Sequence, residues 1–302
     1  MDGAMKVLVT GASGMLGCNL IPLLRERGYD IVAMINRGSL KKRPWAREIL
    51  DGLKLVESRV EEFKGHLEVD AVIHLAAVLR GPTMRVNYRG TVNLLERVKA
   101  DFFVLISSIL ALGDGLRERA DEEAPCIPVT GYERSKCEAE RAVKKSGIKH
   151  LILRPGWIYG PYSINPDILS IARWIKRGIR PVLVSEDLPL ALVHARDVAE
   201  SIIHLLEAGE EGIYNVRGPR MYMMAELLDA ISSFLNREGI RVTVLRWILR
   251  LASRWFDVVR YLDLAPDDMP IDKLLNSGFR PTIDLDGGMR ESLTWMRSRG
   301  LI

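Results

Sequence analysis

Short runs of apolar residues recur along the first half of the chain, separated by segments in which apolar positions repeat at helical spacing. The apolar runs span residues 6–10, 30–35, 53–57, 71–76, 102–107 and 150–155. Helical spacing covers residues 14–27, 83–99 and 131–146, and a glycine follows the first and third of these segments. Strands that alternate with helices in this way predict a parallel sheet with right-handed crossovers and helices on both faces.

The second half of the chain has a different pattern. After Gly160 the alternation becomes irregular and then mainly helical, and no repeat or Pro/Ser-rich linker separates the two halves. We therefore expect a sheet domain over residues 1–160, with further sheet elements from 190–217. A smaller, mainly helical part over 161–302 is expected to pack on it.

Composition narrows the class of protein without identifying a function. Apolar residues make up 48% and charged residues 27% of the 302 residues, as in ordinary globular proteins. A formal net charge of +4 is too small to favour nucleic acid or a membrane surface as a partner. No apolar run reaches the roughly 18 residues that cross a bilayer, and no cleavable signal precedes the first strand.

Cysteines and histidines indicate no metal site. The three cysteines form no pair with metal-ligand spacing, which is typical of a protein in a reducing compartment. His74 and His194 belong to no His/Cys/Asp/Glu cluster, so both are expected to be structural. No GxSxG motif of a hydrolase is present. A cytoplasmic protein without a metal is expected.

The turn after the first apolar run carries the clearest functional signal. It reads Thr10-Gly11-Ala12-Ser13-Gly14-Met15-Leu16-Gly17, with glycines three residues apart. Such glycines allow a tight turn, a close approach of the backbone to a pyrophosphate and close packing of the helix on the sheet. The helix N-terminus then offers free N–H groups to the anion. The turn predicts a dinucleotide site with contacts from Gly11, Ser13, Gly14, Met15, Leu16 and Gly17.

The end of the second apolar run bears on which dinucleotide binds. An NAD site typically has Asp or Glu there to accept hydrogen bonds from the ribose hydroxyls. This chain has Asn36 and Arg37 instead, followed by basic residues at 41–43. A guanidinium beside the ribose favours a 2′-phosphate and hence NADP. NAD, with its ribose held by Asn36 and the basic loop solvated, remains the alternative.

A tyrosine and a lysine form the candidate catalytic pair. Of the eight tyrosines, only Tyr132 has a lysine four residues later, at Lys136. Positions i and i+4 share one face of a helix, so the phenol and the ammonium can converge. The positive charge lowers the pKa of the phenol, as a general acid/base for an alcohol or carbonyl oxygen requires. The alternative is an exposed pair on a surface helix.

Seven motifs in a fixed order give the chain a family resemblance. They are TGASGMLG (10–17), HLAA (74–77), VNYRGTVNLL (86–95), ISSILALG (106–113), YERSK (132–136), LRPGWIYGP (153–161) and LVHARDVA (192–199). In these motifs the chain resembles the extended short-chain dehydrogenase/reductase superfamily, which includes the NAD-dependent epimerase/dehydratase family. The resemblance covers nearly the whole chain. It implies a Rossmann-type, doubly wound sheet with a substrate-binding C-terminal part, and a homodimer.

The resemblance also implies roles for individual residues. Ser108 would hydrogen-bond the substrate oxygen, with Ser107 as the alternative. Tyr132 would donate or accept the proton, and Lys136 would bind the nicotinamide ribose and tune the tyrosine. Further cofactor contacts would come from residues in the matching motifs, namely Ala76, Ala77, Asn87 and Pro155.

Some positions depart from the family pattern. The family usually has an aspartate after the third strand, whereas this chain has Arg59 and Val60 there, beside the expected cofactor. Arg59 is expected to stack on the adenine or to bind a phosphate of the cofactor. Trp157 and Leu190 replace polar partners of a sugar diphosphate, which favours a less polar carbonyl substrate. Arg260 with Asp263 resembles a second phosphate-clamping arginine of the epimerases, which favours a sugar diphosphate instead, because arginine can pair bidentately with phosphate.

Residues 242–262 predict an amphipathic helix with one broad apolar face and arginines spaced by four. Its apolar face is expected to pack on the substrate pocket or on a dimer partner. Contact with a membrane surface or a lipid-like substrate is the alternative, because basic helices with Trp and Phe also lie on bilayers.

Three functions are consistent with the sequence. The first is an NADP- or NAD-dependent oxidoreductase that interconverts a small secondary alcohol and a carbonyl through Ser108, Tyr132 and Lys136. The second is a nucleotide-sugar epimerase or dehydratase that retains its dinucleotide. The third is a non-catalytic dinucleotide-binding regulatory protein, which would not need the three catalytic side chains.

Overall fold

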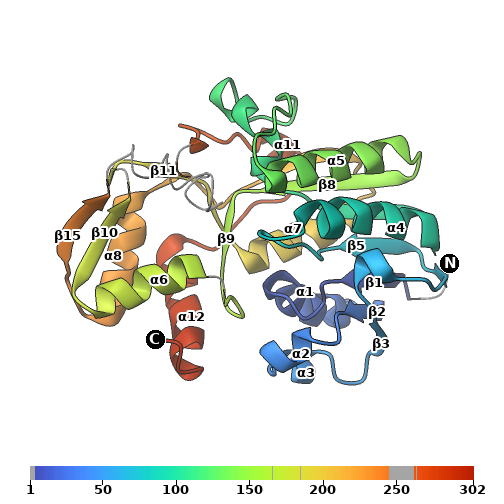
Figure 1. The fold of residues 1–302 in the computed structure, drawn as a ribbon, viewed down its shortest axis with the longest axis horizontal. Coiled ribbons are helices and arrows are strands. Elements are labelled where there is room, and N and C mark those ends of the chain that lie inside the picture. The colour runs from blue at the N-terminus through green and yellow to red at the C-terminus, as the bar shows by residue number, and fades with distance from the viewer. Residues whose placement is uncertain (1–3, 165, 184, 245–261, 263) are drawn as a thin grey trace.

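A seven-stranded parallel sheet forms the centre of the computed structural model, which describes residues 4–164, 166–183, 185–244, 262 and 264–302 (Figure 1). The strand order is β13-β8-β7-β5-β1-β2-β3, and every neighbouring pair is parallel. The strands are β1 (Lys6–Thr10), β2 (Asp30–Ile35), β3 (Lys54–Glu57), β5 (Ala71–His74), β7 (Phe102–Ile106), β8 (Lys149–Pro155) and β13 (Gly212–Val216). The order reverses beside β1, which confirms the doubly wound, Rossmann-type sheet.

Both faces of the sheet are buried because successive strand residues alternate between two apolar cores. In β1, Val7 and Val9 belong to one core and Leu8 to the other. Helices α1 and α7 contribute to the first core, and α4 and α5 to the second. The helices and short turns of this part are α1 (Met15–Glu26), α2 (Ser39–Lys42), α3 (Ala46–Ile49), η1 (Val60–Glu62), η2 (Met84–Arg89), α4 (Gly90–Arg97), η3 (Ile109–Leu112), η4 (Asp114–Arg117), α5 (Gly131–Lys145), α7 (Ala195–Glu207) and α11 (Asp272–Asn276).

The segment expected as one helix over 83–99 is divided in the structure. Its first part, η2, is wound as a π-helix, α4 follows, and the last two residues form the short strand β6 (Val98–Lys99) beside β4 (Leu67–Glu68). The Thr91 hydroxyl donates to the Asn87 carbonyl at 2.6 Å, and Gly90 allows the backbone to approach Val60 closely. These contacts favour a locally widened turn, which apolar periodicity does not reveal.

The C-terminal lobe has a third apolar core and more strands than the sequence pattern predicts. Besides its helices it holds three two-stranded sheets, β9 with β12, β10 with β15 and β11 with β14. Its elements are β9 (Trp157–Tyr159), α6 (Pro166–Lys176), β10 (Ile179–Leu183), β11 (Pro189–Leu190), β12 (Leu192–His194), β14 (Tyr222–Met223), α8 (Met224–Leu235), β15 (Ile240–Val244) and α12 (Leu285–Ser298). Most of the amphipathic segment 242–262, with Arg260 and Asp263, lies outside the described residues. In the part that is described, no helix is long and apolar enough to cross a membrane.

Candidate functional site

The glycine turn between β1 and α1 is shaped by close backbone contacts. Gly11 has a φ of 67°, and a Cβ there would lie 2.7 Å from the backbone nitrogen of Ala76. A Cβ on Gly17 would lie 2.5 Å from the carbonyl oxygen of Ala12. Helix α1 begins at Met15 without a side-chain cap. Its first-turn N–H groups therefore point at the space in front of the turn, where an anion can accept them.

A methyl group at position 11 should damage both the fold and the site. Gly11→Ala forces a strained left-handed backbone and a clash with Ala76, so the free energy of unfolding should fall by about 2 kcal/mol or more. Dinucleotide affinity should fall with it. Chemical denaturation checks the first effect, and Gly28→Ala serves as the control, since its φ is also positive but a Cβ there meets no atom. If the free energy of unfolding fell equally in Gly11→Ala and Gly28→Ala, the close approach of Gly11 to Ala76 would not contribute to stability.

A cavity of about 420 Å³ opens beside this turn. Eight of the predicted cofactor-binding residues line it, namely Gly11, Ser13, Gly14, Asn36, Arg59, Val60, Ala76 and Ala77. Leu16 and Gly17 are buried in the sheet-facing core, so only their backbone groups can face a ligand. The remaining predicted cofactor contacts do not line this cavity either, namely Met15, Arg37, Asn87, Tyr132, Lys136 and Pro155.

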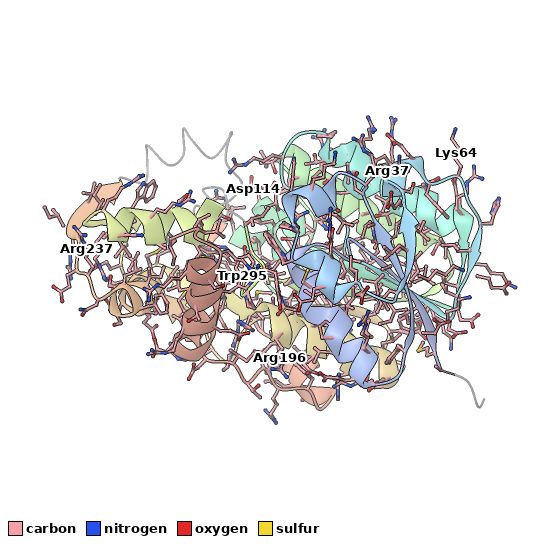
Figure 2. All side chains as sticks on the ribbon, turned by 90° about the horizontal axis from the view of Figure 1, so that it is seen from below. Arg37, Lys64, Asp114, Arg196, Arg237 and Trp295 are labelled. Atoms are coloured by element: carbon pink, nitrogen blue, oxygen red, sulfur yellow. The ribbon has the colours of Figure 1, made fainter. Side chains whose placement is uncertain are left out.

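The structure separates the basic residues after β2. Arg37 lies at the surface (Figure 2), where its Nε donates to Glu57 at 2.9 Å and its side chain is 87% exposed. Arg43 lines the cavity instead, together with Asn36 and Ser39, which precede it by seven and four residues. Its Nε is buried without a hydrogen-bond partner among the described residues. A buried donor of this kind fits an anionic ligand in the cavity.

A chain of buried polar groups fixes the cavity wall formed by residues 74–78. Thr10 Oγ1 lies 2.7 Å from His74 Nδ1 and accepts from the Ala76 N–H at 3.2 Å, while His74 Nε2 lies 3.1 Å from Thr91 Oγ1. Asn87, predicted as a cofactor contact, exchanges hydrogen bonds with both backbone groups of Val78. Burial lowers the pKa of His74 to about 3, so it is a neutral, structural histidine, as expected.

Helix α5 presents the Tyr132–Lys136 pair. The helix starts with a capping box, in which Thr130 Oγ1 accepts from the Glu133 N–H at 3.2 Å and the Glu133 carboxylate accepts from the Thr130 N–H at 3.0 Å. Tyr132 is 7% exposed and Lys136 is 4% exposed. Tyr132 shares an apolar cluster with Ile109, the residue after Ser108, so α5 and η3 bring the three predicted catalytic residues to one region.

Lys136 is held in a buried environment. Its Nζ donates to the carbonyl oxygen of Ile106, at the end of β7, at 2.7 Å. Burial lowers its pKa from the usual 10.5 to about 8, while the Glu140 carboxylate raises it. The ammonium keeps two further N–H donors for a ligand or a neighbour.

The two serines after β7 have different surroundings. Ser107 is buried and donates to Glu140 Oε1 at 2.5 Å. Ser108 is half-buried, caps η3, and accepts from the Leu110 N–H at 3.2 Å, which leaves its own hydroxyl proton for a ligand. The geometry favours Ser108 over Ser107 as the serine that contacts a substrate.

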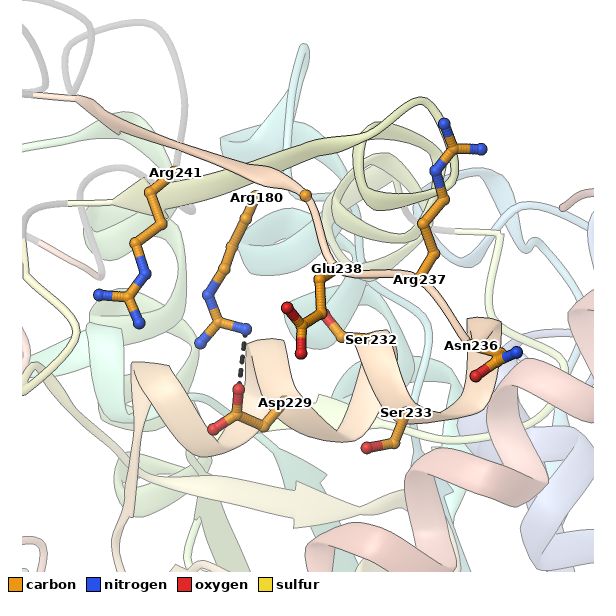
Figure 3. Close-up of a pocket in the computed structure, with 9 residues that line it drawn as sticks. Arg180, Asp229, Ser232, Ser233, Asn236, Arg237, Glu238 and Arg241 are labelled. Carbon is orange, nitrogen blue, oxygen red and sulfur yellow. Dashed lines mark ion pairs between the residues drawn. The ribbon is translucent and has the colours of Figure 1, made fainter.

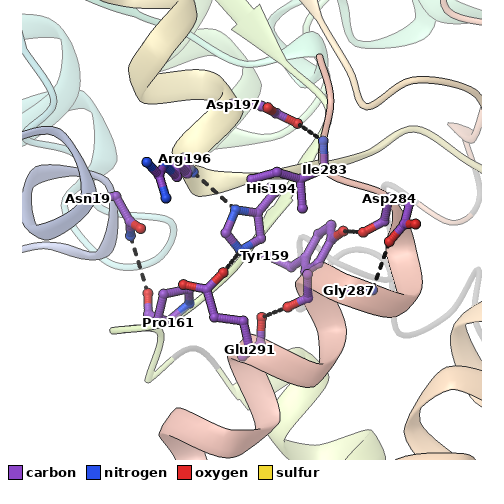
Figure 4. Close-up of polar contacts among 12 residues, drawn as sticks. Asn19, Tyr159, Pro161, His194, Arg196, Asp197, Ile283, Asp284, Gly287 and Glu291 are labelled. Atoms are coloured by element: carbon purple, nitrogen blue, oxygen red, sulfur yellow. Dashed lines mark hydrogen bonds and ion pairs between the residues drawn. The ribbon is translucent and has the colours of Figure 1, made fainter. Parts of the chain in front are cut away.

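His194 lies outside the site and has a structural role (Figure 4). It caps α7 by accepting the Arg196 N–H on Nδ1 at 3.3 Å, and its Nε2 lies 3.5 Å from Glu291 of α12. Burial lowers its pKa to about 4, so it is neutral at physiological pH. Its ring lies between the start of α7 and the C-terminal helix α12.

A second cavity, of about 490 Å³, lies in the C-terminal lobe between α8 and the β10–β15 pair (Figure 3). Arg180 and Asp229 form an ion pair of 2.8 Å within it. None of the predicted site residues lines it. Within residues 4–164, 166–183, 185–244, 262 and 264–302, no group of three or more His, Cys, Asp or Glu could hold a metal ion.

Three polar residues near the site were not singled out from the sequence, although one of them belongs to the basic residues noted at 41–43. They are Arg43 in the cavity, Glu140 on α5 and Arg154 on β8. Glu140 follows Lys136 by four residues, so its position on the same helix face was available as a signal. Arg154 stands within the LRPGWIYGP motif, but a pattern of apolar runs does not reveal that a charged residue in a buried strand has a partner.

Comparisons with known proteins show the family to which the chain belongs. The family model of the NAD dependent epimerase/dehydratase family matches residues 7–216. A putative UDP-glucose 4-epimerase of Methanocaldococcus jannaschii is 25% identical over 97% of this chain and 98% of its own length. A putative dihydroflavonol 4-reductase of Synechocystis is 28% identical over 94% of this chain and 88% of its own length.

A solved structure is similar along almost its whole length. The UDP-glucose 4-epimerase of Thermus thermophilus, in complex with NAD, superposes with a TM-score of 0.75. It is 24% identical and covers 97% of this chain and 99% of that one, so this likeness concerns the fold. The strand order and the glycine turn are those of a Rossmann-type fold, and the matching family consists of NAD-dependent enzymes. The chain belongs to the NAD-dependent epimerase/dehydratase family.

Proposed function

We propose that this enzyme is an NADP-dependent oxidoreductase that interconverts a secondary alcohol and a ketone or aldehyde. The observation that carries the proposal is the buried Lys136, four residues after Tyr132, on a helix packed against the segment that begins with Ser108. A buried ammonium with a lowered pKa is suited to tuning a neighbouring phenol.

Each residue has a separate task in the proposed reaction. The Ser108 hydroxyl donates to the substrate oxygen, and the Tyr132 phenol gives a proton to that oxygen during reduction or takes one during oxidation. Lys136 stabilises the phenolate and binds the nicotinamide ribose. The bound dinucleotide supplies or accepts the hydride, and the protein aligns the reactants.

A carbonyl compound of low polarity is the proposed substrate. Leu190, which the family resemblance matches with a diphosphate-binding arginine, is completely buried in the core of the C-terminal lobe. Exposed apolar side chains flank the start of α5, with Leu79 at 41%, Ile127 at 43% and Val129 at 57% exposure. The loops that carry them meet where Gly131 packs on Thr83. Apolar side chains at this position would contact the non-reacting part of such a substrate.

NADPH should bind at least tenfold more tightly than NADH, a gap of about 1.4 kcal/mol. We assign the 2′-phosphate to Arg43, because Arg43 lines the cavity and Arg37 is paired with Glu57 outside it. Arg43→Met should remove the preference and leave NADH affinity unchanged. Titration by fluorescence, after denaturing release of any bound nucleotide, measures both constants.

Arg37→Met is the matched control for this titration and should keep the preference. Loss of the preference in Arg37→Met but not in Arg43→Met would return the 2′-phosphate to Arg37. Equal affinities in the wild type would reject NADP as the preferred cofactor.

A nucleotide-sugar epimerase or dehydratase is the second candidate, favoured by the likeness to proteins named UDP-glucose 4-epimerase. An epimerase oxidises and re-reduces one sugar and keeps its cofactor, whereas a reductase exchanges NADP in each turnover. Purified protein that arrives with tightly held NAD would favour this candidate, and nucleotide sugars would then be the substrates to test.

The assembly and the division of labour remain predictions. We propose a homodimer in the cytoplasm, with residues 1–160 binding the dinucleotide and 161–302 mainly binding the substrate. Light scattering on the purified protein measures the oligomeric state directly.

A further inference from the structure

A buried ion pair lies behind the proposed catalytic residues. The side chains of Glu140 on α5 and Arg154 on β8 are each only 2% exposed. Arg154 donates through Nε to Glu140 Oε1 at 3.0 Å and through Nη2 to Oε2 at 2.7 Å. An ion pair this deep often contributes no more stability than apolar residues of the same volume. Its position therefore suggests a role besides stability.

A third partner connects this pair to the site. Ser107 donates to Glu140 Oε1 at 2.5 Å. Ser107 lies between Ile106, whose carbonyl accepts from Lys136, and Ser108. Because Lys136 and Glu140 are four residues apart, they contact the same segment from the same face of α5. Two side chains of one helix thus hold two consecutive residues at the end of β7.

We propose that Glu140 is a positioning residue that fixes the end of β7, and with it Ser108, against the face of α5 that carries Tyr132 and Lys136. Arg154 holds the Glu140 carboxylate in place and is itself held by the Glu122 carbonyl, which accepts from Nη1 at 3.1 Å. Glu140 acts through Ser107 and Lys136. The inference rests on the proposed function, since it assigns a task relative to the Ser108, Tyr132 and Lys136 site.

Glu140 is also the nearby anion that keeps Lys136 protonated. Its charge raises the pKa of Lys136 against the effect of burial. Among the described residues, His74 of β5 also interacts with Lys136, and it is neutral because its pKa is about 3. Tyr132 lies on the same face of α5, one turn before Lys136. From η2 the uncharged Asn87 contacts α5 through Ser135, and β7 and η3 present apolar side chains. Without the Glu140 carboxylate, the buried guanidinium of Arg154 would lose its ion-pair partner.

The test is the titration of Lys136 in protein with isotopically labelled lysine, followed by NMR and assigned with Lys136→Met. In the wild type the ammonium should titrate near pH 8. In Glu140→Gln we expect the pKa of Lys136 to fall further below its wild-type value, because an anion is lost and Arg154 is left unpaired. The matched control is Glu138→Gln on the same helix, whose carboxylate pairs with Arg141 at the surface and should leave the titration unchanged. An unchanged titration in folded Glu140→Gln would overturn the proposal.

A second variant covers the case in which Glu140→Gln fails to fold. Glu140→Leu combined with Arg154→Met replaces the ion pair by apolar residues, which buried cores usually tolerate. We expect the Nζ protons of Lys136 to exchange with water about tenfold faster or more, because Ser107 no longer anchors the Ile106 carbonyl. If the Nζ protons of Lys136 exchanged at the wild-type rate in this double variant, the positioning role of Glu140 would be rejected. Neither measurement needs a substrate. If no carbonyl compound is turned over but the Lys136 titration shifts in Glu140→Gln, the proposed function is rejected and the positioning role of Glu140 stands.

Discussion

Replacing Tyr132 with Phe should lower turnover of a carbonyl substrate about 10³-fold, the usual contribution of a general acid/base. The variant keeps the ring that packs in the apolar cluster with Ile109 and removes only the hydroxyl. The fold and the affinity for NADPH should therefore stay within about twofold of the wild type. NADPH oxidation in the presence of a ketone measures the loss, and fluorescence titration measures the binding.

The matched control removes a phenol hydroxyl elsewhere in the molecule. Tyr29 donates to Glu207 at 3.1 Å beyond the C-terminal end of α1, so Tyr29→Phe should keep full turnover. Retained activity in Tyr132→Phe would refute the catalytic assignment. Loss of NADPH binding together with turnover would instead indicate a structural role for Tyr132.

Replacing Lys136 with Met should also lower turnover about 10³-fold, since the phenolate loses its stabilising charge. In the wild type, activity should decline above about pH 8, where Lys136 loses its proton. A pH profile of kcat measures this decline. Lys144→Met, an exposed position on the same helix, should leave both turnover and the profile unchanged. An activity that persists undiminished to pH 10 would contradict the role of the ammonium.

The same lysine should affect stability in a defined direction. Its pKa is lower in the folded protein, about 8, than in the unfolded chain, about 10.5, so the unfolded state binds more protons between these values. The contribution of Lys136 to the free energy of unfolding should therefore rise from pH 8 to pH 10.5 and be lost as the pH falls through 8. Denaturation curves of wild type and Lys136→Met across this range measure the effect, because only the wild type should gain stability from this titration between pH 8 and pH 10.5.

The sheet was predictable because its strands are short, apolar and bounded by clear breaks. The expected runs at 6–10 and 30–35 coincide with β1 and β2. The run at 71–76 continues two residues beyond β5, because apolar character does not end where the loop of the cavity wall begins. The small strand pairs of the C-terminal lobe, such as β11 with β14, are only two residues long and leave no periodic signal.

The site was predictable where backbone geometry dictates residue type. Gly11 needs its left-handed φ and lack of Cβ, so it can be recognised from spacing alone. Arg37 and Arg43 could not be ranked in the same way, because both are basic and follow the same strand. Their surroundings differ in the folded chain, where Arg37 pairs with Glu57 and Arg43 lines the cavity. Side chains that become partners only through tertiary contacts, such as Glu140 and Arg154, can be identified only from the structure.

The order of strands has a consequence for how the protein is made. β8 ends at Pro155, but its outer neighbour β13 is formed by residues 212–216. During synthesis, the outer edge of β8 therefore stays unpaired until the chain through Val216 has left the ribosome and β13 can form. An unpaired apolar strand edge is prone to associate with other chains. A fragment that stops at residue 160 should for this reason aggregate, although it contains the whole glycine turn and both Tyr132 and Lys136.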